Sequence, residues 1–245
     1  MLSIRRAQER GHSDFGWLNS YHTFSFGQYH DRRYMGFSAL RVINDDTVAP
    51  GRGFDSHGHR DMEIISVVLS GALDHKDSMG NGSTIHPGEV QRMSAGTGVL
   101  HSEFNPSPDE PVHFLQIWIV PAREGIEPGY EQRAFSLHDR QGRLCLVASS
   151  SGQDGAVTVH QDVNLYWTTL AKNDAITYSP LAGRNTYIHV ATGRLKLNDQ
   201  TLEAGDGVAL TQIKRGASNP ASSAEDSKLS FSGIQESDVL IFDLP

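Results

Sequence analysis

Two short segments of the chain carry histidine and glutamate at a spacing that suits metal binding. The first contains His57 and His59, and the second contains His101 and Glu103. In a β-strand, residues i and i+2 point to the same face, about 6–7 Å apart along the chain. Two such pairs on neighbouring strands of one barrel would converge inside it. We therefore predict one metal site, for which His57, His59, His101 and Glu103 are the candidate ligands.

The donor set limits the chemistry of this site. Imidazole and carboxylate ligands suit iron, manganese, nickel, copper or zinc. Three neutral donors and one anion leave positions open on a six-coordinate ion, where water, substrate or dioxygen can bind. A lone His-x-His pair recurs by chance in ordinary strands, and a lone His-x-Glu pair is weaker still. Both pairs together, each beside glycines, favour a metal site over a structural role.

Glu63 is a competing carboxylate. It follows His59 by four residues and has the same strand parity, so it could also face the barrel interior. Its alternative role is to accept a hydrogen bond from a ligand imidazole and orient that ring. The residues alone leave both roles open.

The elements that must position these residues are strands. Short apolar or alternating runs, rich in β-branched and aromatic residues, are separated by Gly, Pro, Asn and Asp, and long helical periodicity is absent. This pattern predicts an all-β sandwich or barrel with one or two short helices. The main predicted strands are Phe37–Ile43, Met62–Leu69, Phe114–Val120, Leu144–Ala148, Leu165–Leu170, Thr186–Val190 and Val239–Leu244.

A faint internal repeat predicts two barrels in tandem. A strand, turn and strand run from Gly71 to Gly88, and a similar pattern runs from Gly193 to Gly205. The offsets are 193 − 71 = 122 and 205 − 88 = 117 residues, which is the length of one small barrel.

We therefore predict an N-terminal domain over residues 1–135 and a C-terminal domain over residues 136–245. Ten of the twelve histidines lie at or before His138, so a single metal site belongs to the first domain. The polar, Ser-rich stretch Pro220–Lys228 is predicted to be a surface loop.

Composition and charge exclude several classes of protein. Hydrophobic residues make up 38% of the 245 residues and charged residues 20%, so the chain can form a core and is not typical of disorder. The net charge of −8, without a block of Lys or Arg, argues against direct nucleic-acid binding. No apolar run suits a membrane span or signal peptide, so we expect a cytoplasmic protein. The single cysteine, Cys145, excludes an internal disulfide and is expected to be a core thiol.

The two metal-binding segments also resemble the two motifs of the cupin superfamily. The usual proline of the second motif is replaced by Gly96, and the spacing from Glu63 to Gly71 is one residue longer than the common form. These departures are characteristic of the pirin family, and the sequence resembles a bacterial pirin throughout. The matching motif residues are Gly51, His57, His59, Glu63 and Gly71 in the first segment, and Gly96, Gly98, His101 and Asn105 in the second. Supporting segments include Trp17-Leu18, His22–Phe26, Met35–Asp46 and Gln116–Trp118.

The resemblance implies a bicupin, in which two jelly-roll barrels follow one another and only the first holds one divalent transition-metal ion. Pirin ligands map onto His57, His59, His101 and Glu103, which leaves Glu63 to orient a ligand. Iron is the expected metal, with nickel, manganese, copper or zinc as alternatives. The C-terminal barrel lacks a His-x-His pair and offers only His189. A bicupin covers one barrel with another, so we expect a monomer.

The implied activity is that of a quercetin 2,3-dioxygenase, which opens the heterocycle of a flavonol with dioxygen and releases carbon monoxide. Glu103 is the candidate catalytic base that takes the proton of the 3-hydroxyl group. Apolar residues would hold the flat ligand, and Phe37, Met93 and Trp118 are candidates for its pocket.

Two alternatives stay open from the sequence. Pirins of higher organisms resemble metal-dependent transcriptional cofactors, so the protein could bind a protein partner without turnover. It could also be an enzyme that acts on another small molecule, because cupin barrels serve many reactions. Turnover that depends on Glu103 would favour an enzyme, whereas metal-dependent capture of a partner without turnover would favour a regulator.

Overall fold

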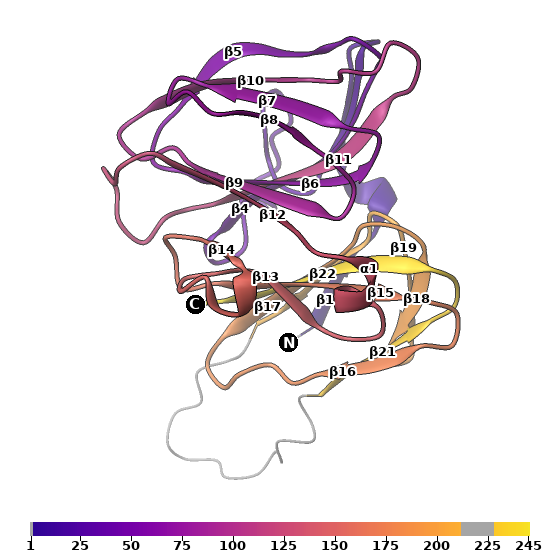
Figure 1. The fold of residues 1–245 in the computed structure, drawn as a ribbon. Helices are drawn as coiled ribbons and strands as arrows, with labels where there is room; N and C mark the ends of the chain where they lie inside the picture. Colours follow the sequence, from indigo (N-terminus) through magenta and orange to yellow (C-terminus); the bar gives the residue numbers. More distant parts are fainter. Residues whose placement is uncertain (1, 212–227) are drawn as a thin grey trace. The chain divides into compact units, whose positions relative to one another are not determined.

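The computed structural model describes residues 2–211 and 228–245, and the chain divides into two compact units (Figure 1). The N-terminal unit comprises residues 10–136 and 147–162. The C-terminal unit comprises residues 1–9, 137–146 and 163–245. Relative to the predicted domains, two short segments thus belong to the opposite unit.

Residues 1–9 and 147–162 are the two segments, and each joins its unit through contacts with residues far away in the sequence, which local sequence patterns do not reveal. Strand β1 (Leu2–Arg5) pairs with β20 (Gly207–Leu210), and Arg6 forms a 2.8 Å ion pair with Asp206. In the other segment, the backbone N–H of Thr158 donates to Glu131 at 3.1 Å.

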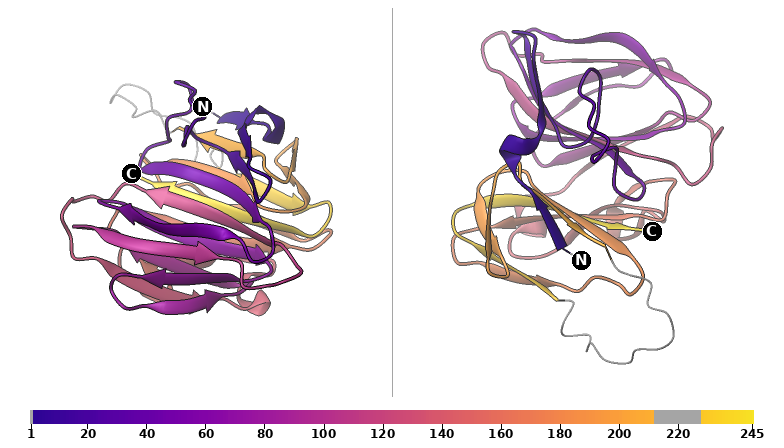
Figure 2. Two further views of the ribbon diagram at one scale, coloured as in Figure 1. Left: turned by 90° about the horizontal axis from the view of Figure 1, so that it is seen from above. Right: turned by 180° about the vertical axis from the view of Figure 1, so that it is seen from behind.

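The N-terminal unit consists of two antiparallel layers. One has the strand order β5-β10-β7-β8, and the other has the order β12-β9-β6-β11-β4-β3-β2. Seen from above in Figure 2, the magenta β10 lies between β5 and β7. The strands are β2 (Gly11–Asp14), β3 (Leu18–His22), β4 (Leu40–Val48), β5 (Gly53–His59), β6 (Glu63–Ser70), β7 (Leu73–Asp77), β8 (Gly82–Ile85), β9 (Glu89–Ser94), β10 (Val99–Phe104), β11 (Val112–Ile119), β12 (Gly129–Ala134) and the two-residue β14 (Val157–Thr158).

The C-terminal unit repeats this plan with the orders β16-β21-β18-β19 and β1-β20-β17-β22-β15. Strand β13 (Cys145–Ser149) crosses the division between the units, and its last two residues pair with β14. The remaining strands are β15 (Asn164–Leu170), β16 (Ala175–Tyr178), β17 (Asn185–Val190), β18 (Arg194–Leu197), β19 (Gln200–Glu203), β21 (Leu229–Gly233) and β22 (Ser237–Leu244).

The internal repeat predicted from the sequence is confirmed by matching turns. Gly71 and Gly193 precede equivalent hairpins with φ of 78° and 79°, and Gly88 and Gly205 follow them with φ of 89° and 85°. Glycine adopts these left-handed angles without steric cost, so the same residue type recurs at the same corner of each barrel. The all-β bicupin prediction is therefore correct.

Most predicted strands are confirmed within one to three residues. The predicted strand Phe37–Ile43 instead begins at Leu40 and continues to Val48, because Phe37 and Leu40 close a tight turn in which Ser38 has φ of 53°. Cys145 is half-buried in β13 rather than enclosed by a core, and burial raises its pKa.

Helices in the described ranges are short, as expected. They are α1 (Leu137–Arg140) and two 3-10 segments (Ala7–Glu9 and Gln153–Gly155). None of them has the length and apolar character needed to cross a membrane. Of the predicted loop Pro220–Lys228, residues 220–227 lie outside the described ranges.

Candidate metal centre

Three histidines of the N-terminal unit point their Nε2 atoms at one place. The Nε2 atom of His101 lies 3.1 Å from that of His57 and 2.9 Å from that of His59. Among the described residues, these three form one group of donor atoms within 4.8 Å of one another. The structure therefore brings together the three histidines that the sequence singled out.

An irregularity in the β5–β10 ladder aims these side chains. His101 pairs with His57, but Glu103 pairs with Phe54, so β5 carries one extra residue between the two pairs. Such a bulge turns residues that a regular strand would place on opposite faces toward the same side. His57, His59 and Phe54 can thus all face the barrel interior. Strict alternation did not predict this arrangement.

The imidazoles are held in a form that can bind a metal. Nδ1 of His57 donates to the backbone carbonyl of Asp55 at 2.8 Å, which leaves the lone pair on Nε2. Burial, followed by the neighbouring histidines, lowers the pKa of His101 to about 2. Burial and His57 lower the pKa of His59 to about 4. Both rings are therefore neutral near pH 7, as a metal ligand must be.

Glu103 is enclosed on the same strand as His101. Its side chain is 1% exposed, and it accepts a 2.7 Å hydrogen bond from Nε2 of Gln116 and a weaker one from Ser66 at 3.4 Å. Burial raises the pKa of Glu103 to about 7, although both hydrogen bonds oppose this shift. A carboxyl group with this pKa can accept and release a proton near neutral pH.

Turns on both sides of β10 hold it in register. The backbone carbonyl of Gly96, which has φ of 44°, accepts from the N–H of Asp61 at 2.9 Å. After the strand, the buried Asn105 donates to the carbonyls of Val48 and Glu110 at 3.1 and 2.8 Å. The second-motif glycine and asparagine thus fix the ends of the strand that carries His101.

The predicted role of Glu63 is wrong. Its Oε2 accepts hydrogen bonds from Ser94 at 3.0 Å and from the backbone N–H of His160 at 3.0 Å, and no ligand imidazole contacts it in the described structure. The parity argument failed because β5 ends at His59 and Asp61 adopts φ of 49° before β6 begins. The turn breaks the two-residue period, so Glu63 faces away from the histidines.

His75 lies beside the cluster, and the sequence analysis missed it. It is 1% exposed, its ring centroid lies 5.3 Å from that of His101, and it forms a second group of possible donors with His101 and Glu103. Its Nε2 lies 3.2 Å from Asp77 and its Nδ1 lies 3.2 Å from the Gln91 amide. The available signal was His75-x-Asp77 on a strand of the repeated hairpin.

A cavity of about 560 Å³ opens beside His57, His59 and Glu103. One wall is aromatic and consists of Phe15, Trp17, Phe26, Phe54 and Trp118. Trp118 was predicted to line a pocket. Met93 instead packs in the core against Ile64, and Phe37 lies outside the lining. Most of the wall was missed because its residues come from separate loops and strands.

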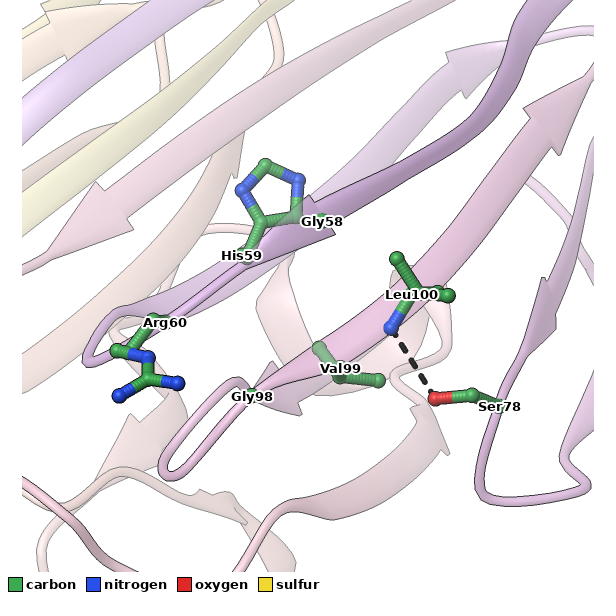
Figure 3. Close-up of a pocket in the computed structure, with 7 residues that line it drawn as sticks. All are labelled: Gly58, His59, Arg60, Ser78, Gly98, Val99 and Leu100. Atoms are coloured by element: carbon green, nitrogen blue, oxygen red, sulfur yellow. Dashed lines mark hydrogen bonds between the residues drawn. The ribbon is translucent and has the colours of Figure 1, made fainter.

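A second, shallow depression lies at the end of the β5–β10 pair (Figure 3). Its lining includes Arg60, Leu100 and Ser78, and Ser78 accepts a 3.1 Å hydrogen bond from the backbone N–H of Leu100. No carboxylate belongs to this lining, so the cavity beside Glu103 is the better candidate for chemistry.

Comparison with known proteins agrees with this geometry. The family model "Pirin" matches residues 3–119, and the model "Quercetinase C-terminal cupin domain" matches residues 146–244. A quercetin 2,3-dioxygenase of Escherichia coli K12 is 45% identical over 245 residues, which cover 100% of this chain and 99% of that protein. A putative quercetin 2,3-dioxygenase of Pasteurella multocida is 43% identical, with complete coverage of both chains.

Solved structures give the same result. The crystal structure of YhhW from Escherichia coli matches with a TM-score of 0.90 at 44% identity and covers 100% of this chain and 98% of that one. The bacterial pirin YhhW in complex with nickel(II) matches with a TM-score of 0.89 at 44% identity, covering 100% and 99% of the two chains. This chain therefore belongs to the pirin family.

Proposed function

We propose that this protein is a metal-dependent dioxygenase of the pirin type that cleaves quercetin with dioxygen and releases carbon monoxide. The convergence of three imidazoles beside a buried carboxyl group and an aromatic cavity carries this proposal. The names of the relatives from Escherichia coli and Pasteurella multocida support the substrate, and the nickel(II) complex of YhhW supports the metal.

The residues fit one divalent metal ion. The Nε2 atom of His101 lies 2.9 Å and 3.1 Å from those of His59 and His57, so the three can each direct a lone pair at a common ion. We assign His57, His59, His101 and Glu103 as ligands. Iron remains our first expectation, and nickel is the alternative that the YhhW complex favours.

When bound, the ion would supply a Lewis-acid centre that favours the ionised, flavonolate form of the substrate. Glu103 accepts the proton of the flavonol 3-hydroxyl group and holds it on a carboxylate oxygen. The Gln116 amide, which donates to Oε2 of Glu103 at 2.7 Å, keeps that carboxyl group oriented during the transfer.

The aromatic wall positions the substrate and excludes water. Trp118 packs edge-on against His59, with ring centroids 5.0 Å apart, so the wall begins at the metal centre itself. Trp17 and Phe54 extend it, with centroids 5.2 Å apart. A flat ligand held by such faces keeps its hydroxyl group near Glu103, which favours the proton transfer.

The test is turnover by metal-free protein that is reconstituted separately with Fe(II), Ni(II), Mn(II), Cu(II) or Zn(II). Quercetin is added under air, and flavonol absorbance and carbon monoxide release are measured. We expect release with at least one metal, none for metal-free protein, and a loss of about 10²–10⁴-fold for Glu103→Ala. His57→Ala should lose both metal and turnover, whereas Glu124→Ala, a change at an exposed glutamate, should retain both.

Tight metal binding without carbon monoxide release by any reconstituted form would contradict the proposal. A different substrate, or the regulatory role considered from the sequence, would then take its place. A monomeric state and the absence of nucleic-acid binding remain predictions.

A further inference from the structure

The cavity has a polar wall that neither the metal centre nor the proton transfer uses. Four inward-facing polar residues form a row across adjacent strands, because Gln116 pairs with Ser66 on one side and Asn44 on the other, and Asn44 pairs with His22. The row begins with Ser66 and Gln116, which hydrogen-bond to Glu103, and it ends at His22 on β3. The interior of a barrel is normally apolar, so a row of this kind needs a reason.

Asp46 lies beside this row and is its most unusual neighbour. It faces the cavity from β4 and is only 3% exposed. Ser20, its partner across the β3–β4 ladder, hydrogen-bonds to its carboxyl group. Its Oδ1 atom has no hydrogen-bond partner among the described residues. A buried acceptor without a partner destabilises the protein, and a ligand that donates a hydrogen bond to it would recover that cost.

The groups around Asp46 indicate what kind of ligand it binds. His22 cannot serve it, because Nδ1 of His22 is engaged with Asn44 at 2.8 Å and Nε2 with Ser13 at 3.0 Å. Asp45, the neighbour in sequence, is paired with Arg10 and His113. Burial raises the pKa of Asp46 to about 7, with the charges of Asp45 and Glu103 adding to the shift. A neutral O–H donor suits such a group better than a cation does.

The position of Asp46 relative to the metal centre suits an aromatic ligand. Asp46 and Gln116 are diagonal neighbours on paired strands, at a separation of roughly 7–8 Å. Gln116 in turn holds Glu103 at 2.7 Å. A fused aromatic ring system that binds at Glu103 can therefore carry a hydroxyl group to Asp46 while its faces contact the aromatic wall.

We propose that Asp46 and Ser20 form a hydroxyl-recognition subsite that accepts a hydrogen bond from a phenolic group of the substrate. The substrate class is thus narrowed to flavonols that carry ring hydroxyl groups besides the 3-hydroxyl. This inference rests on the proposed flavonol chemistry of the same cavity.

The test measures binding without turnover. Metal-loaded protein is titrated under nitrogen with two flavonols. The first, 3-hydroxyflavone, has no hydroxyl group besides the 3-hydroxyl, whereas quercetin has four besides it. Quenching of tryptophan fluorescence reports binding, since Trp17 and Trp118 line the cavity. We expect the wild type to bind quercetin at least about 10-fold more tightly, the value of one hydrogen bond to a buried charged group.

Asp46→Asn and Asp46→Leu should each remove most of this 10-fold preference and leave the Kd of 3-hydroxyflavone within about two-fold. Two variants are used so that a folding failure of one does not end the test. Asp109→Asn makes the same chemical change at an exposed position and should retain the preference. Equal binding of both ligands by the wild type, or a preference that survives both substitutions, would overturn the subsite, as would failure of quercetin to bind.

An aerobic arm separates this inference from the proposed function. Carbon monoxide release without tighter binding of quercetin than of 3-hydroxyflavone would contradict the subsite but would still support the dioxygenase proposal. A preference that depends on Asp46, without carbon monoxide release by any metal form, would support the subsite and contradict the dioxygenase proposal.

Discussion

The two barrels share a strand plan but fill it with opposite chemistry. Each interior position of one barrel has an equivalent in the other. The equivalent positions are found by counting from the matched turns at Gly71 and Gly193 and following the strand register of each barrel. Where the N-terminal unit has His57, His75, His101 and Glu103, the C-terminal unit has Tyr178, Leu197, Leu229 and Phe231.

The seven-stranded sheet of the N-terminal unit and its counterpart in the C-terminal unit show the same contrast between polar and apolar residues. Ser66 and Gln116, which hold Glu103, correspond to Ile188 and Ile241, and that pair belongs to one apolar core. One barrel is therefore stabilised by its interior, while the other accepts buried polar groups whose energetic cost a ligand can offset. The difference shows that the fold does not require a polar interior, so these groups serve function.

Removing a histidine should separate the barrels most clearly. His101→Ala should weaken metal binding by at least about 100-fold, because it deletes one of the donors that converge there. Leu229→Ala, the matched change in the C-terminal unit, should leave metal affinity unchanged. Chelator competition with Ni(II) or Fe(II) measures both. Similar losses of affinity in the two variants would break the comparison.

The reverse ranking is expected for stability. Phe231→Ala should lower the free energy of unfolding by about 3–5 kcal/mol, because Phe231 is fully buried in the C-terminal core. Glu103→Leu in metal-free protein should stay within about 1.5 kcal/mol of the wild type, because relief of the buried carboxyl group offsets the lost hydrogen bond from Gln116.

Urea denaturation measures both effects, with Trp167 reporting on the C-terminal unit and Trp118 on the N-terminal unit. Ser230→Ala, an exposed change one residue from Phe231, should lie within about 0.5 kcal/mol of the wild type. A Glu103→Leu loss as large as that of Phe231→Ala would mean that both interiors are built for stability.

Sequence reasoning succeeded where chemistry followed a local period. His57, His59 and His101 converge because strand parity and pairing place them together. It failed at Glu63, where the left-handed Asp61 breaks the period. Asp46 and the aromatic wall were missed because their proximity to the site comes from pairing across β3, β4 and β11, which no local pattern reveals.

The bounds of the two compact units differ from those of the predicted domains for the same physical reason. Residues 1–9 join the C-terminal unit through pairing with β20, about 200 positions later in the chain. Local composition at the start of the chain contains no information about that partner.

Asp46 should reveal its energetic cost through pH. Its folded pKa of about 7 lies above the ordinary value of 3.8, so its stabilising contribution is complete below pH 3.8 and is lost as the pH rises through 7. Asp46→Asn cannot ionise. It should therefore match the wild type near pH 4 and exceed its free energy of unfolding by about 2–4 kcal/mol at pH 8.

Denaturation at both pH values, followed by Trp118 fluorescence, tests this. The corresponding change in the C-terminal unit is Thr168→Val, which removes no titrating group and should give a difference that is independent of pH. An Asp46→Asn effect of equal size at both pH values would show that ionisation is not the cause.

The last effect should be shared by both barrels. Gly71 and Gly193 have φ of 78° and 79°, and a methyl group on either would press against the backbone that begins β11 or β22. Alanine at each should cost about 1–2 kcal/mol for the left-handed angle, plus the contact. Gly16→Ala, with φ of 78° and open space around it, should show only the angular part. Thermal unfolding compares the three. If alanine at Gly71 or Gly193 cost no more stability than alanine at Gly16, that turn would not constrain its barrel. The equivalence of residues between the two interiors, which is counted from these turns, would then lose its basis.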